Sequence, residues 1–106
     1  MDVNQYDIVL VNLDPTVGNE IKKTRPCLVL SPDEMNKHIQ TVIIAPITSR
    51  SKNYPTRVAI KGTTEGWVVI DQIRTIDKQR IIANFGKISE KEIKKVKSVI
   101  KETLVD

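Results

Sequence analysis

The chain contains very few of the side chains that most metal-binding and nucleophilic sites need. Its 106 residues include a single histidine, His38, and a single cysteine, Cys27. A two-histidine acid–base pair within one chain is therefore excluded, and no Cys/His cluster exists that could bind zinc. The glycine motif with which P-loop proteins hold phosphate is absent as well. Any hydrolytic chemistry must use carboxylates, arginine, threonine or tyrosine, and we expect it to need no metal ion or other cofactor.

The sequence also lacks the features of an exported or membrane protein. No apolar run is long enough to cross a bilayer, and residues 1–5 do not have the basic-then-apolar pattern of a secretory signal. One cysteine cannot form an internal disulfide, and Cys27 lies in an apolar run, where we expect it to pack as a small hydrophobic residue. We therefore expect a cytoplasmic protein with no membrane contact.

What is present fits one domain spanning residues 1–106. Hydrophobic residues make up 40% of the chain and charged residues 28%, which argues against disorder. The net charge is +4 and the pI is about 9.3. This mildly basic balance is compatible with a polyanionic partner, but many basic proteins bind no nucleic acid, so charge alone does not establish one.

Short apolar runs separated by frequent turns predict a mainly β fold. Strands are predicted over 7–13, 27–30, 41–48, 56–60, 67–70 and 80–87, with 71–76 either extending the fifth strand or bending away. Pro46, near the end of the third strand, predicts a bulge or an edge there. We expect a β-rich α+β fold in which a small antiparallel sheet is strongly bent or forms a barrel.

Two capping boxes predict where helices begin. Ser31 and Glu34 form the first, with Pro32 at the first helical position, and they predict one or two turns up to His38. The second, at Ser89, precedes apolar residues at helical spacing and predicts an amphipathic C-terminal helix. These apolar residues are Ile93, Val96, Val99, Ile100 and Leu104. The lysines of this helix alternate with glutamates, and we interpret them as a solvated face.

The segment from residue 13 to residue 26 is the strongest candidate for the protein's chemistry. A proline and a glycine interrupt it, which predicts a loop. Pro26 disfavours helical geometry at Arg25, which should lie at the start of the next strand. The loop can fold back and bring Glu20 to Arg25, where the carboxylate could act as general base and the guanidinium could neutralise a developing phosphate charge. An ordinary surface ion pair is the commoner explanation of such a pair.

Two strand ends add further candidates. Thr48 ends an apolar strand, where its hydroxyl could bind a phosphate oxygen, although β propensity alone also explains a threonine there. Asp71 and Gln72 follow a buried strand and are placed like residues that line a cleft, although a turn-starting aspartate is commoner. Basic residues from three segments could form a groove around these groups: Lys22, Lys23, Arg25, Arg50, Lys52 and Arg57. Within it Asn19, Gln72 and Tyr54 could contact bases by hydrogen bonding or stacking.

Several motifs, in the same order and spacing, resemble the MazF/PemK family of toxins. They are residues 5–15 (QYDIVLVNLDP), 17–20 (VGNE), 24–31 (TRPCLVLS), 46–49 (PITS), 54–55 (YP) and 71–77 (DQIRTID). The resemblance implies an SH3-like, strongly curved antiparallel barrel with a terminal helix, usually in a homodimer. It also implies metal-independent, sequence-specific cleavage of single-stranded RNA, and inhibition by a cognate antitoxin that lays an extended, often acidic segment over the RNA groove.

The resemblance also implies roles for particular residues. Arg25, Thr48 and Glu20 occupy the positions of catalytic residues. The 2′-hydroxyl before the cut would attack its own 3′-phosphate and leave a 2′,3′-cyclic phosphate and a 5′-hydroxyl. Glu20 is the better base, because arginine is almost never deprotonated. The candidates for RNA contact are Asn19, Lys22, Lys23, Ser49, Arg50, Lys52, Tyr54, Asp71 and Gln72.

This sequence departs from the family pattern at three positions. Some members carry His where this chain has Asn19, and some carry Arg where it has Val69, so the acid–base assignments made for those members cannot be transferred. Tyr6 replaces a usual glycine, and we expect only a local backbone effect.

Two other functions stay open: poisoning of DNA gyrase, as by the CcdB toxin of the same fold, and RNA or partner binding without catalysis. The presence of both Arg25 and Thr48 argues against the first.

Overall fold

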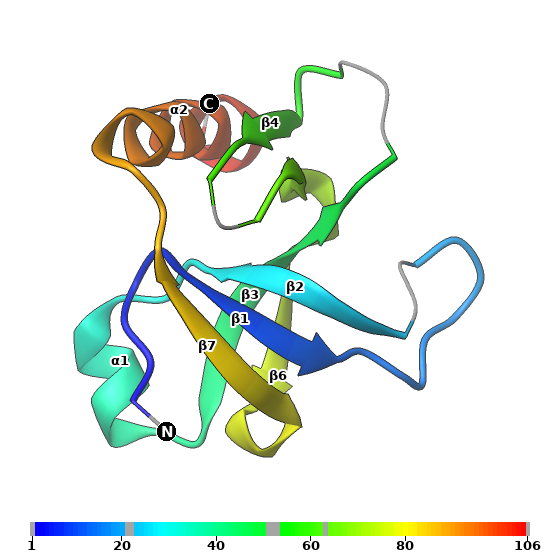
Figure 1. Ribbon diagram of the computed structural model, residues 1–106, viewed down its shortest axis with the longest axis vertical. Helices are drawn as coiled ribbons and strands as arrows, with labels where there is room; N and C mark the ends of the chain where they lie inside the picture. The colour runs from blue at the N-terminus through cyan, green and yellow to red at the C-terminus, as the bar shows by residue number, and fades with distance from the viewer. Residues whose placement is uncertain (1, 21–22, 51–53, 63, 106) are drawn as a thin grey trace.

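The structure is a computed structural model that describes residues 2–20, 23–50, 54–62 and 64–105. Its strands are β1 (Asp7–Asn12), β2 (Thr24–Val29), β3 (Thr41–Thr48), β4 (Arg57–Ile60), β5 (Gly66–Val69), β6 (Arg74–Asp77) and β7 (Ile81–Lys87) (Figure 1). Its helical segments are α1 (Asp33–His38), the 3₁₀ turns η1 (Ile70–Gln72) and η2 (Lys78–Arg80), α2 (Glu90–Ile100) and the π-helical η3 (Lys101–Val105). The predicted strands are therefore confirmed, and the segment after β5 bends away through η1 instead of extending that strand.

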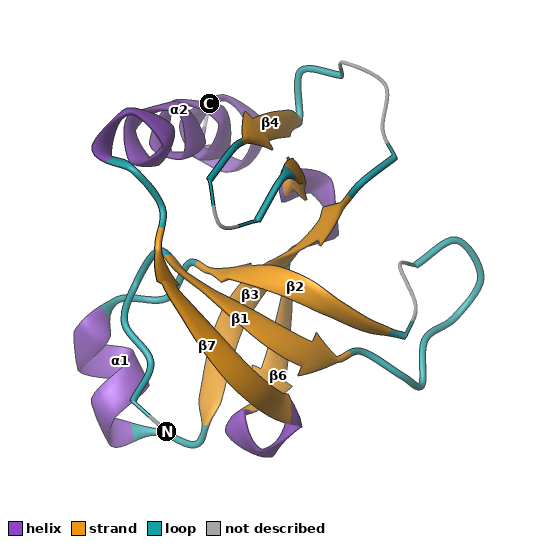
Figure 2. Ribbon diagram, viewed as in Figure 1, coloured by secondary structure: helices purple, strands orange, loops and turns teal. Residues whose placement is uncertain are grey.

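The strands form an antiparallel sheet in the order β4-β5-β3-β2-β1-β7, and β6 also pairs with β3. The expected mainly β fold with a C-terminal helix is confirmed. In the described part of the chain, however, the sheet is not closed, because β4 and β7 are its two ends. Figure 2 shows β1, β2, β6 and β7 in one half of the molecule and β4 with α2 in the other, with β3 running from one half into the other.

Pro46 lies inside β3, at the point where this strand changes partners. On one side β3 pairs with β2, where Cys27 is opposite Pro46. On the other side β6 pairs with β3 up to Ile44, and β5 begins to pair at Ile47. The residue that lacks an N–H group therefore falls at the break between two ladders. The expected bulge or edge is not found, because Pro46 pairs in register with Cys27 in a strand that lies between β5 and β2.

Apolar side chains cover both faces of the sheet. One core consists of Val3, Val9, Val11, Leu13, Cys27, Val29, Val42, Ile44 and Ile76. Neighbouring residues of the same strands, such as Ile8 and Leu28, belong to a second core that includes α2. Strands buried on both faces have near-continuous apolar sequences, as β1 and β2 do. Cys27 is fully buried, so its predicted role as a packing residue is confirmed.

The C-terminal helix α2 packs its predicted apolar face onto the β4–β5 hairpin. Its buried residues Ile93, Val96 and Val99 pack with Val58, Ile60 and Val68. The capping box is confirmed, because Ser89 Oγ accepts a hydrogen bond from Glu92 N at 3.2 Å and Ser89 N donates to Glu92 Oε1 at 3.1 Å. The apolar face of the helix ends at Ile100. Leu104, which we expected to belong to this face, lies in η3 and is 60% exposed.

The capping box predicted at Ser31 is wrong. Pro32 occupies the N-cap of α1, and no side chain caps the helix. Ser31 is buried, and its hydroxyl donates to Asn36 Oδ1 at 2.5 Å and accepts from Ile43 N in β3 at 3.1 Å. This serine therefore fixes α1 to the sheet and is not available to cap the helix.

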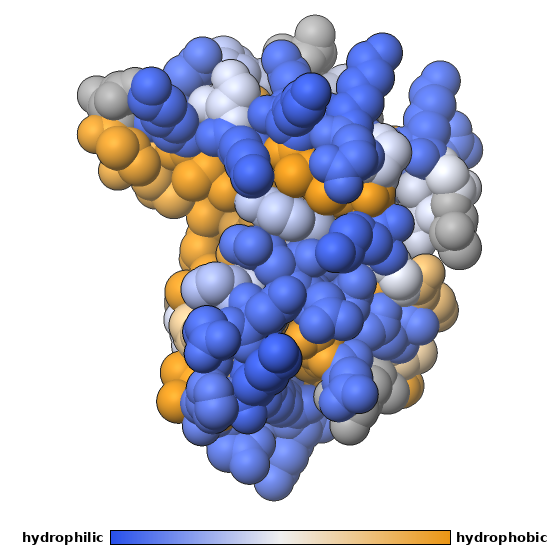
Figure 3. All heavy atoms as spheres, turned by 90° about the vertical axis from the view of Figure 1, so that its left-hand side faces the viewer, coloured by the Kyte–Doolittle hydropathy of each residue, from blue (hydrophilic) through white to orange (hydrophobic). Residues whose placement is uncertain are grey.

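The outer faces of both helices are polar. Figure 3 shows hydrophilic side chains over the face that carries α1 and the start of α2, with apolar atoms visible beneath α2. The lysines of α2 and η3 are exposed, as predicted for a solvated face. Among the described residues, no helix is long and apolar enough to span a membrane.

Tyr6 adopts a left-handed backbone conformation just before β1. Its φ is 70°, a region that favours glycine. The Tyr6 N–H donates to Val29 O at 2.7 Å, and its carbonyl accepts from Ile88 N at 3.1 Å. These bonds stabilise the strained residue, and the expectation that the departure from glycine acts only locally stays a prediction.

Candidate functional site

A cleft of about 220 Å³ separates the loop after β1 from the turn after β5. It is lined by Leu13, Glu20, Pro46, Asp71, Gln72, Ile73 and Arg74. These residues come from the β1–β2 loop, β3, η1 and the start of β6, which are distant in sequence. Glu20, Asp71 and Gln72, three of the predicted site residues, therefore lie around one cavity.

Two arginines hold the base of the β1–β2 loop. Arg74 Nη1 donates to Leu13 O at 3.1 Å, and Arg80 Nη1 donates to Asn12 O at 3.1 Å and to Asp14 O at 2.6 Å. Lys23 N donates to Asp14 Oδ1 at 3.0 Å across the loop. The loop is thus fixed at its stem while its tip, which includes Val17, is exposed.

Glu20 lies at the tip of this loop, whereas Arg25 lies in the strand after it. Glu20 Oε1 accepts a hydrogen bond from Val17 N at 2.5 Å, so the carboxylate closes the tip of its own loop. Arg25 lies within β2, opposite Val11, in the extended conformation that Pro26 predicts, and is half-buried. The pairing of Glu20 with Arg25 stays a prediction.

Thr48 is the last residue of β3, and its hydroxyl shapes the turn that follows. Its Oγ1 donates to Arg50 O at 3.1 Å and accepts from Arg50 N at 3.3 Å. Gly66 lies against the same residue, since a Cβ on Gly66 would meet Thr48 O at 2.7 Å. Only a residue without a side chain allows β5 to come this close to Thr48.

Asp71 is held in η1 by two donors from the β4 region. Its Oδ1 accepts from Thr56 Oγ1 at 2.8 Å and from Arg57 Nε at 3.0 Å. Burial alone would raise the pKa of Asp71, but the hydrogen bonds from Arg57 and Thr56 and the charge of Arg57 outweigh it and lower the pKa below its usual range. Arg57 also lies over the ring of Tyr54, 5.3 Å from its centroid. Arg57, predicted to line a basic groove, thus connects Asp71 to Tyr54.

The other predicted contact residues are spread over the surface around these groups. Asn19, Lys23, Ser49, Arg50 and Tyr54 are exposed, and Gln72 is half-buried in the cleft. Lys22 and Lys52 lie outside the described residues.

Cys27 is not a nucleophile in this fold. Burial raises the pKa of its thiol to about 12, and the charges of Arg74 and Arg25 lower it only partly. His38 lies at the exposed end of α1, with Nε2 3.6 Å from Glu34 Oε2. Among the described residues, no group of three or more His, Cys, Asp or Glu side chains could hold a metal ion.

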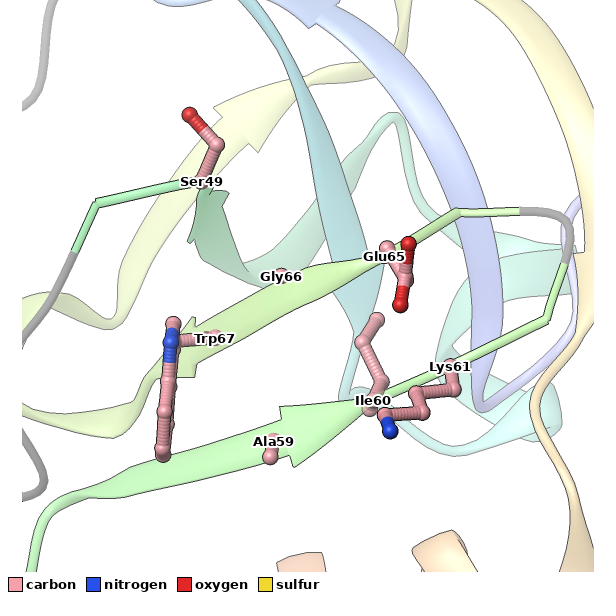
Figure 4. Close-up of a pocket in the computed structure, with 7 residues that line it drawn as sticks. All are labelled: Ser49, Ala59, Ile60, Lys61, Glu65, Gly66 and Trp67. Atoms are coloured by element: carbon pink, nitrogen blue, oxygen red, sulfur yellow. The ribbon is translucent and has the colours of Figure 1, made fainter.

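Trp67 is a surface feature that the sequence analysis did not select. It lies in β5 opposite Thr48, beside a second hollow of about 350 Å³ (Figure 4). The hollow is lined by Ser49, Ala59, Ile60, Lys61, Glu65, Gly66 and Trp67. The available signal was that the only tryptophan of the chain directly follows a glycine at the start of a strand.

The fold and cleft define a small antiparallel β protein with a C-terminal helix and a polar cleft beside one long loop. A family model for the "PemK-like, MazF-like toxin of type II toxin-antitoxin system" matches residues 4–104, and the chain therefore belongs to this family. It is 34% identical to endoribonuclease MazF of Staphylococcus saprophyticus over 89% of this chain and 84% of that protein. It is 32% identical to endoribonuclease EndoA of Bacillus subtilis over 98% of this chain and 96% of that protein.

Solved structures agree with this assignment. MazF of Deinococcus radiodurans has a TM-score of 0.88 and 27% identity, over 98% of this chain and 97% of that one. A mycobacterial endoribonuclease in complex with its cognate antitoxin has a TM-score of 0.83 over 96% of this chain and 94% of that one, and at 20% identity it supports the fold alone.

Proposed function

We propose that this MazF-type toxin is a sequence-specific endoribonuclease that cuts single-stranded RNA, chiefly mRNA in the cytoplasm, without a metal ion. The observation that carries the proposal is the near full-length match to two named endoribonucleases. The cleft supports it, because it gathers Glu20, Asp71 and Gln72 beside a loop that leads to Arg25.

In the proposed reaction the RNA supplies its own nucleophile. The 2′-hydroxyl before the cut loses its proton to Glu20 and attacks the adjacent phosphorus. The bond to the 5′-oxygen breaks, and that oxygen takes a proton from water. The products are a 2′,3′-cyclic phosphate and a 5′-hydroxyl. In-line attack requires a strand that is free to bend out of a regular duplex, which favours single-stranded substrates.

Arg25 and Thr48 would stabilise the extra negative charge on the phosphate oxygens. A guanidinium is suited to this because it presents several donors in a fixed geometry. The Thr48 hydroxyl now donates to Arg50 O, so binding of the phosphate requires that it exchange this acceptor for a phosphate oxygen. Phosphate binding would therefore rearrange the turn after β3.

The remaining predicted residues would hold the RNA. Asn19, Gln72 and Tyr54 offer hydrogen bonds and an aromatic face to bases, and the basic residues attract the backbone. The basic residues are Lys22, Lys23, Arg50 and Lys52. An antitoxin with an extended acidic segment would compete with RNA for the same cleft. We also propose a homodimer, with residues 1–106 as one toxin domain.

Replacement of Arg25 tests the catalytic proposal. Arg25→Ala should lose RNA cleavage by about 100-fold or more, since it removes a charge that stabilises the transition state. Its circular dichroism spectrum and melting temperature should stay close to those of the wild type. Lys94→Ala on α2 is the matched control for loss of one positive charge and should cleave normally. Full activity of Arg25→Ala, or loss of wild-type cleavage in EDTA, would contradict the proposal.

A further inference from the structure

Trp67 is the only tryptophan of the chain; it is half-buried, is paired with Thr48 and lines an open hollow. We infer that its indole is a stacking platform for an RNA base next to the cleaved phosphate. This inference rests on the proposed cleavage of RNA and adds a binding residue that neither the family pattern nor the cleft identifies.

Strand pairing places Trp67 and Thr48 on the same face of the sheet. The two residues are directly opposite each other in the antiparallel β3–β5 pair. Side chains of such partners point to the same side, with Cβ atoms about 5 Å apart. Val68, the next residue along β5, points the other way and is fully buried in the core under α2. The register therefore fixes Trp67 outward, next to the hydroxyl that would hold the phosphate.

Small residues leave room for a flat ligand beside the indole. Ala59 is opposite Trp67 on the other strand of the hairpin, and Gly66 precedes it. Figure 4 shows the indole beside Ala59, with the side chains of Lys61 and Glu65 at the far end of the hairpin. Ser49, which follows Thr48, lies at the edge of the same hollow. The free volume and the ring are thus both adjacent to the proposed phosphate site.

The surroundings match how proteins bind single strands without pairing their bases. Such surfaces combine aromatic rings, on which bases stack, with basic groups along the backbone. Arg57 lies two residues before Ala59 in β4, on the same face of that strand, and is stacked on Tyr54. Tyr54, just before this hairpin, is therefore held beside Arg57, and Trp67 lies on the neighbouring strand β5.

A fluorescence titration tests the inference with the whole protein. The probe is an RNA containing the mapped cut site with a 2′-deoxy nucleotide before it, which lacks the attacking hydroxyl and is bound but not cut. Because Trp67 is the only tryptophan, the emission reports its surroundings alone. We expect this RNA to quench the emission as it saturates the protein. The anisotropy of labelled RNA shows independently when the protein is saturated. Unchanged tryptophan emission at that point would overturn the inference.

Variants separate stacking from a structural effect. Trp67→Ala should weaken binding of the same RNA about 5- to 100-fold, the range for loss of one stacked base, whereas Trp67→Phe should retain most of the affinity. Phe85→Ala removes an exposed aromatic side chain from β7, the far end of the sheet, and should bind normally. Equal binding by Trp67→Ala, or an equal loss in Phe85→Ala, would contradict the assignment.

An RNA series with one base removed at each position around the cut identifies the stacked base. In the wild type, one such deletion should lower affinity, and in Trp67→Ala the same deletion should have no further effect. Fully additive losses would overturn the inference. If the wild-type protein neither binds nor cuts RNA, the proposed function itself is contradicted. If the protein cuts RNA but the emission of Trp67 does not change, only the present inference is contradicted.

Discussion

At the scale of single residues, Asp71 shows how the site and the hairpin support each other. Its carboxylate lines the cleft from η1 and is bound by Thr56 and Arg57 on the β4 side. Its side chain is 38% exposed, so solvent screens the ion pair, and its contribution to stability is at most about 1 kcal/mol. The contact matters more for position, because Arg57 in turn stacks on Tyr54.

Asp71→Asn should remove a pH-dependent part of the stability. The pKa of Asp71 is lowered in the folded state, so its charge stabilises the fold above the unfolded pKa of about 3.9. This stabilisation is lost as the pH falls through the lowered pKa. In urea unfolding, the variant should be slightly less stable than the wild type near neutral pH, and the difference should shrink below about pH 3. A difference that is the same at both pH values would contradict this.

Single residues also show what the sequence can and cannot predict. The extended backbone of Arg25 follows from its neighbour Pro26, and the burial of Cys27 follows from the apolar run around it. Ser31 has a local pattern that predicts a cap, but its hydroxyl binds Ile43, twelve residues away. A long-range contact outweighed a local preference, and nothing in the local pattern could reveal it.

At the scale of elements, the approach of β5 to β3 determines where Thr48 lies. A Cβ on Gly66 would be 2.7 Å from Thr48 O and 3.0 Å from Ile47 Cγ2, and both belong to the paired strand. Contact with backbone cannot be relieved by a change of rotamer. The first residue of β5 must therefore be glycine if Thr48 is to keep its position.

Gly66→Ala should accordingly lose about 1–3 kcal/mol of unfolding free energy and much of the RNA cleavage. Gly62→Ala is the matched control, because Gly62 also has a positive φ but its Cβ would meet no atom within 4 Å. The difference between the two variants in urea unfolding reports the contact with Thr48. Equal effects of both substitutions would show that backbone strain alone matters.

The N-terminus of α2 should be equally sensitive. Ser89→Ala removes the capping hydroxyl and should cost about 1 kcal/mol of stability in thermal or urea unfolding. Glu92 would keep the hydrogen bonds from the backbone N–H of residue 89, at 3.1 Å, and from Lys61 N, at 2.7 Å, the second of which ties the helix to the residue after β4. Ser98→Ala, at an exposed position of the same helix, should be neutral. A neutral Ser89→Ala would contradict the role of the capping box.

The sequence predicts α2 well and the pairing of the strands less well. Both outcomes depend on how far apart in the chain the interacting residues lie. Capping and helical periodicity are local, so the start of α2 and its buried face could be predicted from Ser89 onward. The partners of β3 are set by residues far along the chain. The same limit applies to the cleft, since Glu20 and Asp71 line one cavity only because β1, β3 and β6 are arranged in one sheet.

At the scale of the whole molecule, charge should govern how RNA is bound. The chain carries a net charge of +4, and Lys23 and Arg50 are exposed on the segments that follow β1 and β3. Each phosphate that these residues neutralise releases counterions. The logarithm of the binding constant should therefore fall with the logarithm of salt concentration, with a slope of about −0.7 per phosphate for a single strand. A slope near zero would contradict a basic RNA surface.

The most direct test of the central claim is the chemistry of the cut ends. Purified wild-type protein is incubated in EDTA with a long RNA of defined sequence, and the cuts are mapped by primer extension and end-group analysis. The proposed mechanism predicts discrete cuts at a short base motif, with 5′-hydroxyl and 2′,3′-cyclic phosphate ends, and no cut where a 2′-deoxy nucleotide precedes the site. Ends that carry a 5′-phosphate and a 3′-hydroxyl would contradict it, because they require attack by water instead of the 2′-hydroxyl.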